Sequence, residues 1–146
     1  MGNLSFLFVA IGGAIGAVAR YGFSTLINNR RVDGFPAGTM AVNVIGSFII
    51  GFLFTSISPL IGGALLPDSI ANARTWVGFL NLLLITGFCG GFTTFSTATI
   101  DAVSLARTGR VRQAVSYTLV TLIAALVAVS LGALVGDLVV MLVVPG

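Results

Sequence analysis

Four long runs of apolar residues alternate with short polar links along the chain, and this pattern predicts four membrane-spanning helices. A helix needs about 20 predominantly apolar residues to cross the hydrocarbon core of a bilayer. The expected spans cover residues 4–27, 38–57, 75–105 and 114–144. The apolar stretch 60–66 is too short to span and is expected at the membrane interface. No internal repeat divides the sequence, so residues 1–146 are interpreted as a single all-helical membrane domain.

The third run differs from the others because its middle, residues 86–97, is rich in glycine and hydroxyl residues. Three glycines and five serines or threonines fall within these twelve positions. Glycine weakens a helix by about 1 kcal/mol relative to alanine, and serine and threonine offer the backbone alternative hydrogen-bond partners. Irregular backbone at membrane depth needs cover from protein or from a water-filled cavity. The third run is therefore predicted to form two half-helices that meet at a break near residues 87–94.

Two pairs of glycines have the four-residue spacing of close helix packing faces. They are Gly12 with Gly16 in the first run and Gly132 with Gly136 in the last. Because glycine is common in membrane helices, we interpret both pairs as packing contacts without a further role.

Composition agrees with a membrane protein and excludes most enzyme chemistry. Of 146 residues, 57% are hydrophobic and 8% are charged, whereas about a quarter of the residues of a soluble domain are charged. So small a chain cannot bury this much apolar surface in its own core, so membrane lipid is the expected partner of that surface. With no histidine and one cysteine, Cys89, a Ser-His-Asp triad, an imidazole metal site and a disulfide framework are all excluded. The arginines form no dense basic patch, so nucleic acid is not an expected partner.

Polar groups inside a bilayer are costly, so their positions indicate ion or substrate pathways. Arg20 lies roughly 10 Å of helix from the end of its run. It can extend its head to the interface, or it can form a fixed positive charge at the mouth of an anion path. Asn43 can bridge two helices or donate its amide N–H groups to an anion.

The block of residues 93–97 is the most informative stretch of the chain. Its hydroxyl groups can donate to an anion, and a phenyl ring presents a positive edge. Weak and multiple donors suit a pore that strips water from a small anion without trapping it. A cation pathway would show inward carboxylates or rings of carbonyls, but the one acidic residue near this run, Asp101, lies at its far end.

Three sequence blocks resemble the CrcB/Fluc family of fluoride channels, and the resemblance covers essentially the whole chain. The blocks are GGAIGAVARY at residues 12–21, GTMAVN at residues 38–43 and TGFCGGFTTFST at residues 86–97. The resemblance implies an antiparallel dimer of four-helix subunits with two pores. It further implies that the protein is a multi-pass protein of the cell membrane and that fluoride leaves the cytoplasm passively through it.

The resemblance also implies roles for individual residues. The residues expected to line the fluoride pathway are Asn43, Thr94, Phe95, Ser96, Thr97, Tyr117 and Thr121. Arg20 matches an arginine near the aqueous vestibule. A structural sodium ion, which is not transported, is expected at the dimer interface on the backbone carbonyls of Gly90 and Thr93. Ala98 departs from the family pattern, which has a second pore phenylalanine there, so either this pore tolerates alanine or a partner subunit supplies the ring.

The arginines are distributed unevenly over the two sides of the membrane. The first and third links lie on one side and carry five of them, Arg30, Arg31, Arg107, Arg110 and Arg112, against Arg74 alone on the other. The positive-inside rule then places both termini outside. A chain with one preferred orientation needs a partner of the opposite orientation, so we favour a heterodimer with an opposite-topology paralogue and keep the homodimer as the alternative.

Two other functions stay open at this stage. A proton-coupled exporter of a small molecule or ion normally needs a membrane-embedded carboxylate, and none precedes Asp101 in the first three runs. A non-conducting accessory subunit, which only completes a partner's pore, is compatible with Ala98.

Overall fold

The computed structural model describes residues 2–30, 34–61 and 73–144. In chain order the elements are α1 (Gly2–Asn28), α2 (Ala37–Pro59), α3 (Ala73–Asn81), the π-helical segment η2 (Leu82–Cys89), α4 (Gly90–Phe92), α5 (Phe95–Arg107) and α6 (Val111–Val143). No strand occurs in these ranges, so the all-helical prediction is confirmed. Most of the stretch 60–66, together with Arg31, lies outside the described residues.

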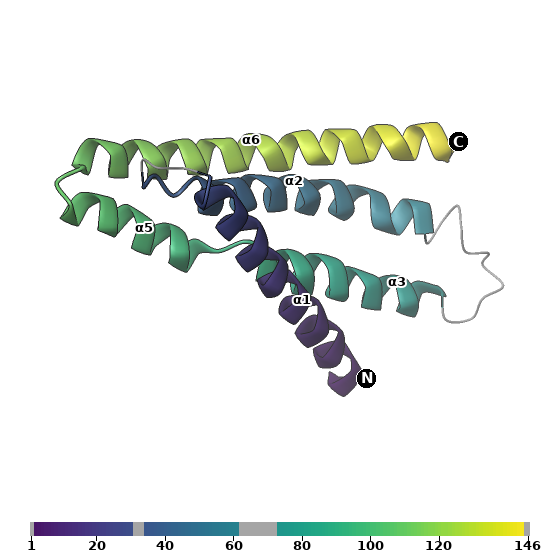
Figure 1. The fold of residues 1–146 in the computed structure, drawn as a ribbon. Helices are drawn as coiled ribbons and strands as arrows, with labels where there is room; N and C mark the ends of the chain where they lie inside the picture. Colours follow the sequence, from purple (N-terminus) through teal and green to yellow (C-terminus); the bar gives the residue numbers. More distant parts are fainter. Residues whose placement is uncertain (1, 31–33, 62–72, 145–146) are drawn as a thin grey trace.

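Four helical stretches are long and apolar enough to cross a membrane, as predicted. They are Leu4–Asn28, Ala37–Ile57, Thr75–Arg107 and Val111–Val143. The third stretch combines α3, η2, α4 and α5, which follow one another along one line with an interruption in the middle (Figure 1). Figure 1 shows the α5–α6 link and the start of α2 at one end of the bundle, and the end of α6 at the other.

The four spans form two pairs, and the two spans of each pair run in the same general direction. In the first pair α1 packs beside η2 and α4, and in the second α2 packs beside α6. Figure 1 shows α2 and α6 side by side over most of their length, whereas α1 crosses the third span obliquely.

Glycines allow the helices of the first pair to approach backbone to backbone. A Cβ atom on Gly12 would overlap the carbonyl oxygen of Leu83, and one on Gly16 would overlap that of Phe88. On the facing helix, a Cβ on Gly91 would overlap the carbonyl oxygen of Gly13. The first glycine pair is therefore a packing face, as its spacing predicted.

The second pair of helices uses the same device. A Cβ on Gly132 would overlap the carbonyl oxygen of Phe48, and one on Gly136 would overlap the hydroxyl oxygen of Thr55. The packing role predicted for these two glycines is confirmed. Across the same interface the Thr55 hydroxyl donates to the carbonyl oxygen of Ala133 at 3.2 Å.

The break in the third span is present but narrower than predicted. Residues 87–92 remain helical, and only Thr93 (φ −81°, ψ 158°) and Thr94 (φ −153°, ψ 120°) are extended. Gly87 and Gly91 stay helical because their missing side chains give α1 room to pack, and this contact offsets their low helix propensity. The glycines therefore mark the packing face beside the break, and the threonines mark the break itself.

Candidate functional site at the break in the third span

The two threonines of the break end one helix and begin the next. The backbone N–H and the hydroxyl of Thr93 both donate to the carbonyl oxygen of Cys89, each at 2.9 Å, which closes the first half-helix. The hydroxyl oxygen of Thr94 accepts the backbone N–H of Thr97 at 3.1 Å and so caps the N-terminus of α5. The Thr94 hydroxyl in turn donates to the Thr97 hydroxyl oxygen at 3.0 Å. Within the described part of the chain the Thr97 O–H has no acceptor, so it is available to a ligand.

The peptide groups of Thr94 are paired with one side chain from another helix. Asn43, in α2, donates from Nδ2 to the Thr94 carbonyl oxygen at 2.9 Å. Its Oδ1 accepts the Thr94 backbone N–H at 2.7 Å. Of the two interpretations of Asn43, the bridge between helices is therefore realised. One N–H of the amide is left over, because an asparagine side chain carries two.

Backbone carbonyls at the break form the candidate metal site. The last turn of a helix leaves its carbonyl oxygens without intrahelical donors. Among the described residues, no hydrogen bond from outside the helices reaches the carbonyl oxygens of Gly90 or Thr93. Gly90 also faces open space, since a Cβ there would meet no atom within 4 Å. The described residues hold no cluster of three or more histidine, cysteine or acidic side chains, so a hard cation at the break would rely on these carbonyls.

A cavity of about 490 Å³ lies between α2, α5 and α6 in front of the break. The predicted pathway residues that line it are Asn43, Thr94, Phe95, Tyr117 and Thr121. The Phe95 ring is 87% exposed, and so forms one edge of the cavity rather than part of a core. Ala98, Ala102 and Ala125 contribute only methyl groups to the lining, which explains much of the cavity's width.

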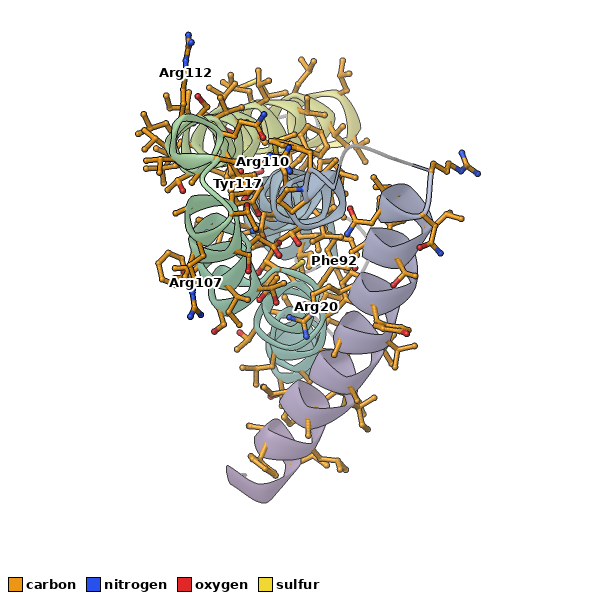
Figure 2. All side chains as sticks on the ribbon, turned by 60° about the vertical axis from the view of Figure 1, so that its left-hand side comes forward. Arg20, Phe92, Arg107, Arg110, Arg112 and Tyr117 are labelled. Carbon is orange, nitrogen blue, oxygen red and sulfur yellow. The ribbon has the colours of Figure 1, made fainter. Side chains whose placement is uncertain are left out.

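A second cavity, of about 220 Å³, lies on the other side of Thr94, towards α1. Its lining includes Arg20, Thr39, Thr94 and Thr97. Figure 2 shows Arg20 beside the third span, whereas Arg107 and Arg112 extend from the outside of the molecule. Arg20 therefore lines a cavity together with hydroxyl residues, and its role near a vestibule stays a prediction. Ser96 lines neither cavity, so its place in the pathway stays a prediction.

Three buried polar atoms have no hydrogen-bond partner among the described residues, and two of them belong to residues that line the large cavity. They are the Tyr117 hydroxyl, the Thr121 hydroxyl and Oδ2 of Asp101. Tyr117 is only 1% exposed, and its ring packs edge-on against Phe35 with ring centroids 5.7 Å apart. Buried polar atoms normally bond to protein, water or a ligand, so the Thr121 hydroxyl, in the lining of the large cavity, can bind water or an ion.

Sequence reasoning missed Thr39 and gave Asp101 no place in the site. The Tyr117 hydroxyl faces both the Thr39 hydroxyl and the Asp101 carboxylate, although neither reaches hydrogen-bond geometry. The spacing of Asp101, four residues after Thr97 on one helix, could have indicated a shared face. Thr39 gave no such signal, because only the packing of α2 against α6 brings it to Tyr117.

Comparison with known proteins gives consistent matches over most of the chain. Residues 7–133 match the profile of the family described as CrcB-like protein, Camphor Resistance (CrcB). The chain is 38% identical over 135 residues to a fluoride-specific ion channel FluC of Hydrogenobaculum sp. (strain Y04AAS1), which covers 92% of this chain and 99% of that protein.

Two further relatives have similar names and similar coverage. The fluoride-specific ion channel FluC of Parabacteroides distasonis is 40% identical over 126 residues, which is 86% of this chain and 88% of the relative. The fluoride-specific ion channel FluC 1 of Listeria monocytogenes is 37% identical over 133 residues, which is 91% of this chain and 98% of the relative.

Proposed function

The chain belongs to the CrcB-like family, and from this membership we propose that it is a subunit of a membrane channel that conducts fluoride. It is a multi-pass membrane protein with four spanning helices, and its family is one of channels rather than enzymes. The structural observation that supports the proposal is the cavity at the break, where amide, hydroxyl and phenyl groups gather and no carboxylate of the described residues lines the wall.

These groups suit the passage of a small, strongly hydrated anion. The free N–H of Asn43 and the hydroxyls of Tyr117 and Thr121 can replace some of the water around fluoride, and the positive edge of Phe95 adds a weaker attraction. Each donor is weak by itself, so an ion can enter and leave. Arg20, in the adjacent cavity, raises the local concentration of anions.

A second subunit, in antiparallel orientation, would close the open side of the pathway. The exposed Phe95 ring and the open face at Gly90 are the parts of the site that lack cover within this chain. The arginine bias favours a paralogue of opposite topology over a second copy of this chain, since a chain of one orientation cannot pair antiparallel with itself.

A sodium ion could bind the backbone carbonyls of Gly90 and Thr93 at the break. It would supply positive charge to backbone oxygens that have no donor and would join two subunits without being transported. If sodium has this role, replacing it with a large organic cation should reduce the recovered dimer fraction, measured by size-exclusion chromatography. An unchanged dimer fraction would argue against the ion.

Fluoride efflux from liposomes tests the proposed function. We expect efflux when this chain is reconstituted with a candidate paralogue, and efflux should persist after a protonophore dissipates the proton gradient. An exporter would stop under that treatment. Robust efflux from this chain alone, together with an antiparallel homodimer, would contradict the heterodimer. An accessory subunit is the remaining alternative, and unchanged transport after Phe95→Ala would favour it.

A further inference from the structure

Thr94 occupies the junction between the two cavities of the site. It lines the cavity of about 490 Å³ together with Phe95, and the cavity of about 220 Å³ together with Arg20. No other residue of the described ranges lines both. Thr94 therefore lies in the wall of both cavities.

Regular secondary structure does not hold Thr94 in this position. Its backbone is extended, and it follows Thr93, which is extended as well. The N–H and the C=O of Thr94 form no helical backbone hydrogen bond. Both pair instead with the side-chain amide of Asn43, at 2.7 and 2.9 Å. The Asn43 side chain, from α2, thus supplies the hydrogen-bond partners that a continuous helix would have supplied.

Most of the bonding capacity of Asn43 is used within the protein. An asparagine side chain offers two N–H donors and one oxygen acceptor. The oxygen and one N–H bind Thr94, so a single N–H is left to face the larger cavity. A residue whose main task was to coordinate an anion would keep both donors available.

We propose that Asn43 is a positioning residue, which holds the Thr94 peptide so that the Thr94 hydroxyl stays in the wall shared by the two cavities, bonded to the Thr97 hydroxyl of the smaller one, along the path of the ion. The position of the Thr94 peptide also affects Thr97, because the Thr94 hydroxyl caps α5 and donates to the Thr97 hydroxyl. This inference rests on the proposed fluoride channel, since it concerns the route of the same ion.

Removing the Thr94 N–H while leaving every side chain intact tests the inference directly. The α-hydroxy acid analogue of threonine at residue 94 replaces that N–H with an ester oxygen. We expect initial fluoride efflux of the reconstituted channel to fall about tenfold or more, as for Asn43→Ala. Because both changes break the same contact, combining them should lower efflux by no more than about twofold beyond Asn43→Ala alone.

The corresponding hydroxy acid at Val111 is the matched control. It removes an N–H at the first position of α6, where a helix has no acceptor for it, and should leave efflux unchanged. The inference is overturned if the ester at residue 94 behaves like this control while Asn43→Ala abolishes efflux. It is equally overturned if the two effects multiply to about a hundredfold, as expected for independent sites.

Amide hydrogen exchange separates this inference from the channel function. Measured on the full chain in nanodiscs, Asn43→Ala should speed exchange of the Thr94 amide at least about tenfold. The Thr93 amide should keep its rate, because it donates to Cys89. This measurement does not depend on transport. If the chain conducts no fluoride, the proposed function is refuted, but exchange at Thr94 still tests the role of Asn43. Unchanged exchange at Thr94 in the variant would refute the positioning role.

Discussion

The two pairs of spans pack by the same kind of glycine contact, but only one of them contains a break. In both pairs glycines let two backbones meet, α1 against η2 and α4 in the first pair, and α2 against α6 in the second. The second pair continues unbroken, and the hydroxyl contact from Thr55 to Ala133 adds to its packing. The first pair stops at Thr93 and leaves backbone groups that need partners.

The difference shows how a close helix pair can support an interrupted span. The break begins two residues after Gly91, the last glycine that packs against α1, so a fixed backbone precedes it. The unbroken pair supplies Asn43, which closes the break from the side. One pair therefore acts as a support, and the other carries the irregular backbone along which an ion pathway can form.

The largest expected effect comes from filling a glycine contact. Gly16→Leu should cost about 3 kcal/mol or more, because the new side chain would meet the backbone of Phe88 and not a movable side chain. Gly132→Leu should do the same in the second pair. The measurement is the fraction of protein recovered as a monodisperse species. Gly22→Leu is the control, since nothing lies within 4 Å of a Cβ there. If it is lost as readily as Gly16→Leu, close packing is not the cause.

Phenylalanine in place of alanine should distinguish the open region from the closed pair. Ala128 in α6 is 7% exposed, so Ala128→Phe should destabilise the protein by about 1–3 kcal/mol through overpacking. Ala98→Phe adds its ring to a cavity of about 490 Å³ and should leave the melting temperature nearly unchanged. Thermal unfolding in detergent compares the two variants. Equal losses would mean that the cavity is not available to a ring.

Loss of the Thr94 hydroxyl should affect both stability and transport. Thr94→Ala removes the N-cap of α5 and should cost about 1 kcal/mol. We also expect slower fluoride efflux, because the hydroxyl lies between the two cavities. Thr94→Ser keeps the hydroxyl and should retain most of both. If the serine variant is as slow as the alanine variant, the hydroxyl is not what matters at the junction.

Loss of the Thr55 hydroxyl should be the mildest change. Thr55→Val removes a contact across the second pair that is worth about 0.6 kcal/mol in membrane proteins. A small drop in melting temperature with unchanged efflux is expected, measured on the same samples. A transport defect here would show that the unbroken pair is more than a support.

Sequence patterns sufficed to predict the spanning elements. Apolar run length predicted four spans, and the glycine spacing predicted both packing faces. The predicted break near residues 87–94 was located less accurately. The low helix propensity of glycine does not by itself distinguish a break from a packing face. The contacts of Gly87 and Gly91 with α1 decide that question.

The sequence alone determined that the protein is helical, apolar enough to need lipid, and interrupted by polar residues in its third span. These properties follow from chemistry that is local in the chain. Only the tertiary structure decided that Asn43 pairs with Thr94, that Thr94 separates two cavities, and that Asp101 and Thr39 face Tyr117. Such contacts join residues far apart in sequence, and they depend on how closely the helices approach.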